Sequence, residues 1–288
     1  MDNKKILWKI FGILKYPFTA ALLYLVFSHI DFATVTAIIK TLDTKMVAIL
    51  ILISLVKIVL QYNNWRLYLK LFPGIDVSHG QSLLAFLAGT TFKLITPGGV
   101  GVYGRMLMLN MRKRDSFLAI SYEKIVQSWG MLFWGVIAAA ITFSNVNVIL
   151  RLIVPAVFLT LPLLLFVIPR PSKFIPDTRI PALPPFILQA FIYILTIFQY
   201  YLFIKSFTDF SLLKAFGSVP LVQLANTIPI TVSGLGLREH FAILVYPPIG
   251  VSKELAISCS LFVFMISNVA PAILGVILML LKPTNKTK

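Results

Sequence analysis

The pattern of apolar and polar residues along the chain predicts a protein built from membrane-spanning helices. A helix that crosses a bilayer needs about 20 mostly apolar residues. Six stretches meet this requirement, at 12–30, 46–69, 116–143, 148–168, 186–207 and 254–281. We therefore expect an all-α integral membrane protein with six transmembrane helices.

Two further apolar regions, 78–110 and 212–248, are each interrupted near the middle by glycine and proline. The interruptions read TPGGVG at 96–101 and IPITVSGLG at 228–236. At 1.5 Å per residue, the second arm of each region is too short to cross a bilayer. Each region is therefore predicted to be a re-entrant helical hairpin, which enters the membrane and leaves it on the same side.

The two interruptions resemble each other at an offset of 135 residues, which indicates an internal duplication. In this register the matching residues are Thr96, Gly99 and Gly101 with Thr231, Gly234 and Gly236. The same offset aligns span, hairpin and span in the two halves. We expect one membrane domain, 1–288, with repeat one at 46–143 and repeat two at 186–281. The linking span at 148–168 would invert the second copy.

Composition and charge fit this arrangement and give it an orientation. The chain is 58% hydrophobic and 12% charged, whereas soluble domains carry about 25% charged residues. Most of the basic residues behind the net charge of +16 fall in predicted loops on one side, which the positive-inside rule makes cytoplasmic. Both termini are then cytoplasmic in a cell (inner) membrane, hairpin one enters from the cytoplasm and hairpin two from outside. No nucleic-acid partner is expected.

Ionisable side chains near the two interruptions are the candidate functional residues, because a charge in the bilayer interior costs at least ~2.5–3.5 kcal/mol. By position these are Lys57, Lys93, Arg105, Glu123, Lys124, Arg238, Glu239 and His240. For some of these residues a purely structural role stays open. Arg238 and Glu239 could form an ion pair at a helix start, Glu123 could be solvated from the cytoplasmic side, and a lone histidine is usually a packing residue.

The two glycine-rich breaks are expected to meet near the middle of the membrane, since irregular backbone at that depth must be buried in protein or line a wet cavity. Each break precedes a short helix, whose positive N-terminal end attracts anions. The N–H groups of Gly99, Gly101, Gly234 and Gly236 would be free to bind an anionic group. For Gln223, Asn226 and Asn268 a structural packing role is favoured over lining or capping the cavity.

We assign roles to the charged residues on this basis. Arg105 and Arg238 are expected to bind the anionic group, and Glu239 to orient Arg238 or exchange a proton. Gating or proton-linked roles are assigned to Glu123, Lys124, His240 and Lys93. The sequence carries no Walker A motif, Asp-rich metal pair, Ser/His/Asp arrangement or His/Cys ligand spacing, and Cys259 is its single cysteine. No metal, cofactor or enzymatic activity is therefore expected.

The segments TPGGVGVYGR, YEK and IPITVSGLGLRE resemble the lysylphosphatidylglycerol synthase transmembrane, or flippase-like, family over residues 8–282. The family pattern in the first half is Pro-Gly-x-x-Gly-Glu, a base three residues on, and an acid-Arg pair in the next span. Here Val102 replaces the acid, and Glu123 with Lys124 stands for the acid-Arg pair. The matching residues are Pro97, Gly98, Gly101 and Arg105, then Pro229, Gly234, Gly236, Arg238 and Glu239.

The resemblance implies a membrane lipid translocator that moves a lipid with an anionic or phosphate-containing head group between leaflets. It implies a stand-alone member without the soluble aminoacyl-transferase domain, with a lipid synthase or glycosyltransferase as a further partner. Two alternatives stay open at this stage. One is a membrane enzyme or accessory subunit acting on a lipid-linked head group, with Glu123 and Glu239 as acid and base; the other is a scaffold for a synthase.

Overall fold

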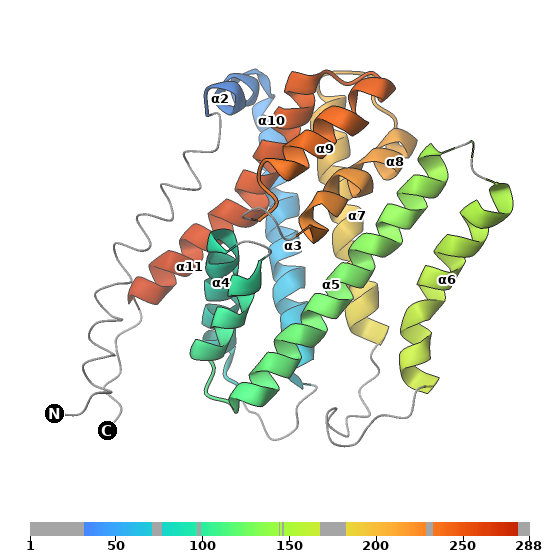
Figure 1. Ribbon diagram of the computed structural model, residues 1–288. Helices are drawn as coiled ribbons and strands as arrows, with labels where there is room; N and C mark the ends of the chain where they lie inside the picture. The colour runs from blue at the N-terminus through green and yellow to red at the C-terminus, as the bar shows by residue number, and fades with distance from the viewer. Residues whose placement is uncertain are drawn as a thin grey trace.

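The computed structural model describes residues 32–70, 77–96, 99–143, 145, 147–167, 183–228 and 233–281. Within these ranges every regular element is a helix (Figure 1). The predicted span at 12–30 and the residues 168–182 and 282–288 lie outside the described residues. The expectation of an all-α protein is confirmed for the part of the chain that the structure describes.

Four helices in the described residues are long and apolar enough to cross a membrane. They are α3 (Thr44–Lys70), α5 (Lys113–Thr142), α7 (Leu183–Lys205) and the helix Lys253–Leu281. The last consists of α10 (Lys253–Phe264), a π-helical turn η4 (Met265–Val269) and α11 (Ala270–Leu281). All four lie where the hydropathy pattern predicted spans. Helix α6 (Val148–Val167) occupies the region of the predicted span at 148–168, but its apolar part Val148–Thr160 is shorter than the four candidate spans. This span, and with it the total of six, stays a prediction.

The long helices place apolar side chains outside and polar ones inside, which is the arrangement expected in lipid. On α3, Leu52, Leu55 and Val59 are more than half exposed, whereas Lys57 and Asn64 are buried. In water this would be unfavourable, because apolar surface would face solvent and polar groups would lose their hydration. In a bilayer the same pattern lets polar side chains face the bundle interior. The protein is thus a multi-pass membrane protein.

Two helical hairpins complete the bundle. The first is α4 (His79–Ile95) with the 3₁₀ helix η1 (Val100–Leu107). The second is α8 (Leu212–Gln223) with the 3₁₀ turn η2 (Leu224–Thr227) and α9 (Leu237–Val245). Figure 1 shows α4 in the lower half of the molecule and α8 and α9 in the upper half. The first arm of each begins at a serine N-cap, Ser78 or Ser211, whose hydroxyl accepts a backbone N–H three residues on.

Each hairpin packs against the last long helix of the other half of the chain. Helix α4 lies against α11, α8 lies against α5, and α3 lies against α7. Small residues and threonines at these crossings let the paired helices approach each other closely. The Thr91 hydroxyl donates to the Ala272 carbonyl over 2.8 Å, and the Thr142 hydroxyl donates to the Gly217 carbonyl over 2.8 Å. The two halves therefore interlock rather than stand side by side.

The second arms of the hairpins differ from each other. The arm of the second hairpin begins at Leu237, where the sequence predicted it. The arm of the first hairpin was predicted to be a helix from about Val102, but it is a 3₁₀ helix from Val100. Gly101 makes this tighter winding possible, because a Cβ there would lie 2.1 Å from the carbonyl oxygen of Phe92. The second arm thus packs directly on the backbone of α4.

The α4–α11 contact predicts a stability effect at Gly275. A Cβ at this position would lie 2.5 Å from the Leu87 carbonyl oxygen, so the backbone of α4 has to move. We expect Gly275→Ala to lower the free energy of unfolding by about 1–3 kcal/mol, measured by thermal unfolding of the purified protein in detergent. Gly80→Ala is the matched control, since nothing lies within 4 Å of a Cβ there. Equal stability of the two variants would contradict the close contact.

Candidate functional site

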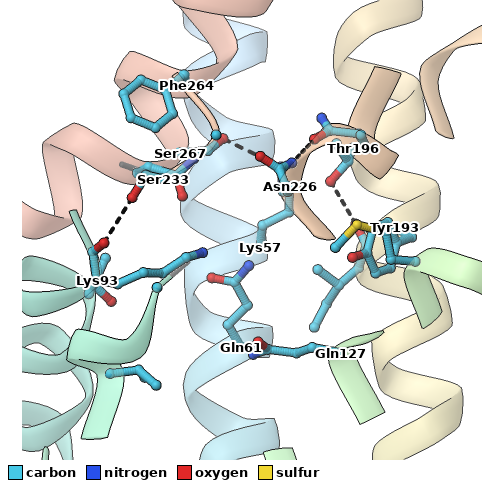
Figure 2. Close-up of a pocket in the computed structure, with 18 of the residues that line it drawn as sticks. Lys57, Gln61, Lys93, Gln127, Tyr193, Thr196, Asn226, Ser233, Phe264 and Ser267 are labelled. Carbon is cyan, nitrogen blue, oxygen red and sulfur yellow. Dashed lines mark hydrogen bonds between the residues drawn. The ribbon is translucent and has the colours of Figure 1, made fainter. Parts of the chain in front are cut away.

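A cavity of about 430 Å³ lies where the two hairpins meet the long helices. Residues from α3, α4, η1, α5, α7, α10 and η4 line it together with the residues around both glycine-rich breaks. Figure 2 shows its walls, with polar side chains reaching inward from several helices, among them Lys57, Gln61, Lys93, Gln127, Tyr193, Thr196, Asn226 and Ser267. The cavity is open on one side, because Ser128, Leu132, Asn226 and Thr227 line it and are also exposed.

The first hairpin contributes a buried arginine that is paired with a carboxylate of the next helix. Arg105 of η1 forms a salt bridge with Glu123 of α5, and both side chains are about 95% buried. The Gln127 amide donates to the other oxygen of Glu123 over 2.9 Å. The Arg105 guanidinium lies over the rings of Trp65 and Phe86, at 4.6 and 5.3 Å from their centroids. Carboxylate and ring faces together compensate the cost of burying this charge.

The second hairpin contributes an equivalent group. Arg238 of α9 donates to Glu239 over 2.8 Å and to the Ser260 hydroxyl of α10 over 2.7 Å. Ser260 in turn donates to the same Glu239 oxygen over 2.9 Å. The other oxygen of Glu239 accepts the Gly236 N–H over 2.7 Å, and the Arg238 guanidinium lies 4.6 Å from the Phe264 ring centroid. The ion pair considered for Arg238 and Glu239 is thus present, and Arg238 also lines the cavity.

Three lysines also line the cavity, and none has a carboxylate partner among the described residues. The Lys57 ammonium donates to Gln199 Oε1 over 2.6 Å and to Ser267 Oγ over 3.4 Å. Lys93 and Lys124 have no side-chain hydrogen bond or salt bridge in this part of the chain. Figure 2 shows Lys57 and Lys93 reaching toward the same central space. Among the described residues, the basic side chains that line the cavity therefore outnumber the carboxylates beside them.

The glycine-rich breaks touch each other at this cavity. Gly99 and Gly234 both line it and both have left-handed backbone conformations, with φ of 67° and 78°, which glycine adopts without steric cost. Ser233, beside Gly234, donates its hydroxyl to the Lys93 carbonyl over 3.0 Å. This hydrogen bond joins the second hairpin to the first. The expected convergence of the two breaks is thus present in the described residues.

The expectation that the N–H groups of these glycines are free is wrong for three of them. Gly99 N–H donates to the Thr96 carbonyl over 3.2 Å, Gly101 N–H to the Thr96 hydroxyl over 2.6 Å, and Gly236 N–H to Glu239. Tight turns satisfy their own donors, because buried N–H groups without partners are costly. Gly101 and Gly236 are not among the lining residues. The side-chain cations, rather than these N–H groups, give the cavity its charge.

Two other candidates lie outside the cavity wall. His240 is exposed, so it is not part of the group that the structure brings together. Glu239 does not line the cavity itself but holds Arg238, which does. Among the predicted polar residues, Gln223, Asn226 and Asn268 do line it. Val102, which stands where the family pattern has an acid, is a buried apolar part of the wall.

Several lining residues were missed by sequence reasoning, although a helical pattern pointed to them. Gln61 follows Lys57 by four residues on α3, and Gln127 follows Glu123 by four on α5. Residues four apart share one face of a helix, so a polar face on each apolar helix could have been found. On α7 the face consists of Gln189, Tyr193, Thr196 and Tyr200.

The geometry defines a class: a multi-pass helical membrane protein with an interior cavity bounded by two broken hairpins and lined by cations. The model of the family described as lysylphosphatidylglycerol synthase TM region matches residues 9–275 of the chain. The chain therefore belongs to this family, whose members are membrane proteins involved in lipid handling. No curated protein matches the chain.

The position of Arg105 depends on Gly89 of α4, which yields a prediction. A Cβ at Gly89 would lie 2.1 Å from Arg105 Nε, and the arginine cannot give way easily because Glu123 and two rings hold it. We expect Gly89→Ala to lower the free energy of unfolding by about 1–3 kcal/mol, measured by thermal unfolding in detergent.

A double-mutant cycle tests the cause of this loss. In a background that removes the pair, Arg105→Ala with Glu123→Gln, the Cβ at Gly89 meets no guanidinium. Gly89→Ala is then expected to cost almost nothing. The same loss in both backgrounds would mean that Gly89 has another role, such as a contact within α4.

Proposed function

We propose that this protein translocates a lipid with an anionic, phosphate-containing head group between the two leaflets of a cell membrane. The head group would pass through the cavity while the acyl or prenyl tails stay in the surrounding lipid. The observation that carries the proposal is the meeting of two buried arginines, one from each hairpin, at a cavity that three further lysines line. Arginine presents a planar fork of donors that matches the oxygens of phosphate.

The arrangement of the hairpins supports a path through the membrane rather than a closed pocket. Each hairpin lies at its own end of the bundle (Figure 1), and their tips meet at the Ser233–Lys93 hydrogen bond. We propose that the two hairpins are re-entrant halves of an inverted repeat. The exchange of partners, with α4 on α11 and α8 on α5, is what an inverted duplication would produce. Small rocking movements of one half against the other would then expose the cavity alternately.

The two salt bridges supply a way to couple head-group binding to such a movement. Phosphate oxygens accept the same guanidinium donors that Glu123 and Glu239 now occupy. A bound phosphate would therefore compete with Glu123 for Arg105 and with Glu239 for Arg238. Competition at Arg105 would loosen η1 from α5, and competition at Arg238 would loosen α9 from α10.

The open side of the cavity, with Leu132 and Ser128 at its rim, would let the tails remain outside.

A proteoliposome assay with fluorescent phospholipids tests the proposed function. We expect the protein to move an anionic phospholipid between leaflets, and Arg238→Lys and Arg105→Lys to slow this by about tenfold or more, since lysine keeps the charge but loses the bidentate geometry. Lys45→Gln is the control, because Lys45 is exposed and lies outside the cavity. Unchanged rates in the Arg238→Lys and Glu239→Gln variants would overturn the proposal. A covalently altered lipid in mass spectra would favour the alternative of a membrane enzyme.

The re-entrant topology predicts a labelling pattern in whole membranes. The chain has one cysteine, Cys259, which is buried, so a Cys259→Ala protein gives a clean background. We expect Gly80→Cys and Asn110→Cys, at the two ends of the first hairpin, to react with an impermeant thiol reagent from the cytoplasmic side. Lys214→Cys and Pro248→Cys, at the ends of the second hairpin, should react from the outer side. Labelling of the two ends of one hairpin from opposite sides would contradict a re-entrant fold.

A further inference from the structure

We infer that the head group accepted by this cavity carries at least two negative charges, as a phosphomonoester or a diphosphate does, and that a head group with net positive charge is excluded. The inference rests on the proposed function and names the substrate class of the same site. It follows from a charge balance within the cavity and from the placement of three lysines in its walls.

Within the described ranges, three of the basic side chains that line the cavity have no carboxylate partner. Five cationic side chains line the cavity: Lys57, Lys93, Arg105, Lys124 and Arg238. Two carboxylates lie against them, and both are fully engaged. Glu123 accepts from Arg105 and Gln127, and Glu239 accepts from Arg238, Ser260 and the Gly236 N–H. Among the described residues, five basic side chains against two carboxylates leave the three lysines without an acidic partner, so an anionic ligand would hold them in their charged form.

Lys93 and Lys124 form one anion position, beside the left-handed Gly99. A Cβ built on Gly99 would lie 3.6 Å from Lys124 Nζ and 3.8 Å from Lys93 Cε. The two side chains come from α4 and α5, so they flank this glycine from different helices. Like charges this close repel, and the repulsion is stronger in an interior of low dielectric than in water. An anionic group between them would turn repulsion into attraction, and Gly99 lies on the cavity wall at this point.

Lys57 forms a second position on the wall contributed by α3. Neutral acceptors, Gln199 and Ser267, hold its ammonium. Gln199 is fixed in turn, because its amide donates to Ser54 Oγ over 2.6 Å and to the Leu50 carbonyl over 3.0 Å. Ser267 belongs to the π-helical turn η4, and such turns are frequent at functional sites. Lys57 is thus a buried basic group held in a fixed orientation, with no carboxylate partner in the part of the chain that the structure describes.

A cationic head group has no counterpart in this cavity. An ammonium group, such as that of an aminoacylated lipid, needs a carboxylate or several free carbonyl groups as partners. In this structure Glu123 and Glu239 both pair with arginines, and even a carboxylate released by a phosphate would leave the three lysines to repel an ammonium group. The neutral side chains Gln61, Gln127 and Asn226 suit hydroxyl groups or phosphate oxygens instead. Although the family takes its name from lysylphosphatidylglycerol, the residues of this chain favour a polyanionic head group over that lipid.

Binding to lipids of graded charge tests the inference. The purified full-length protein in detergent would be titrated with four probes: farnesyl diphosphate, dioleoyl phosphatidic acid, dioleoyl phosphatidylglycerol and lysylphosphatidylglycerol, with native mass spectrometry as the readout. We expect affinity to fall in this order, by about tenfold between the diphosphate and phosphatidylglycerol. Equal or tighter binding of phosphatidylglycerol or lysylphosphatidylglycerol would overturn the inference.

Lysine variants show whether the three cations cause the preference. We expect Lys93→Met, Lys124→Met and Lys57→Met each to weaken diphosphate binding by about tenfold while changing phosphatidylglycerol binding far less, and Lys45→Met to change neither. Removal of an uncompensated charge should also raise the unfolding temperature of the ligand-free variants, so loss of binding is not loss of fold. An equal loss of affinity for farnesyl diphosphate and for phosphatidylglycerol would contradict the assignment of the three lysines to polyanion binding.

The translocation assay separates this inference from the proposed function. If the protein binds the diphosphate selectively but moves no lipid between leaflets, the proposed function fails and the substrate class stands. If it moves lysylphosphatidylglycerol as fast as phosphatidic acid, the proposed function stands and the charge preference fails.

Discussion

Most of the structure around the cavity depends on one constraint, which is that a buried guanidinium must be paired. Arg105 and Arg238 are 4% and 3% exposed, and an unpaired charge so deep in a protein would be strongly destabilising. Each pairing also joins two elements. The Arg105–Glu123 bridge connects η1 to α5, and the Arg238–Glu239–Ser260 group connects α9 to α10. The short second arm of each hairpin is therefore attached to the next long helix through its arginine.

The same bonds explain how the site combines stability with responsiveness. The Arg105–Glu123 pair holds the first hairpin arm, and the bonds of Arg238 and Glu239 to Ser260 hold the second, only while nothing else offers oxygens to the guanidinium groups. A phosphate in the cavity offers the same kind of acceptor, so structural bonds and ligand bonds compete for the same donors. The lysines differ from the arginines in this respect, because they have no carboxylate to exchange. In our proposal the lysines attract the head group, and the arginines transmit its arrival to the hairpins.

The sequence predicted the large features because each has a simple physical signature. Apolar runs located α3, α5, α7 and the helix Lys253–Leu281, and two glycine-rich breaks located the hairpins and the place where they meet. Finer features depended on contacts between distant segments. Local packing, which no hydropathy pattern contains, determines three of these features. They are the 3₁₀ winding of η1, the internal hydrogen bonds of the Gly101 and Gly236 N–H groups, and the outward position of His240. The role of Gly89 could not be predicted from the sequence for the same reason, since this glycine leaves space for a side chain of another element.

The π-helical turn η4 has a consequence for the register of the last helix. It widens the winding at Met265–Val269, so α10 and α11 are not in one uninterrupted α-helical phase. An α-helix turns by about 100° per residue, and a chain one residue shorter at this point would present a different face of α11 to α4. Gly275 would then leave the crossing, and the Ala272 carbonyl would lose the Thr91 hydroxyl. The local irregularity that supplies a wall of the cavity thus also sets the angular phase on which docking of the first hairpin depends.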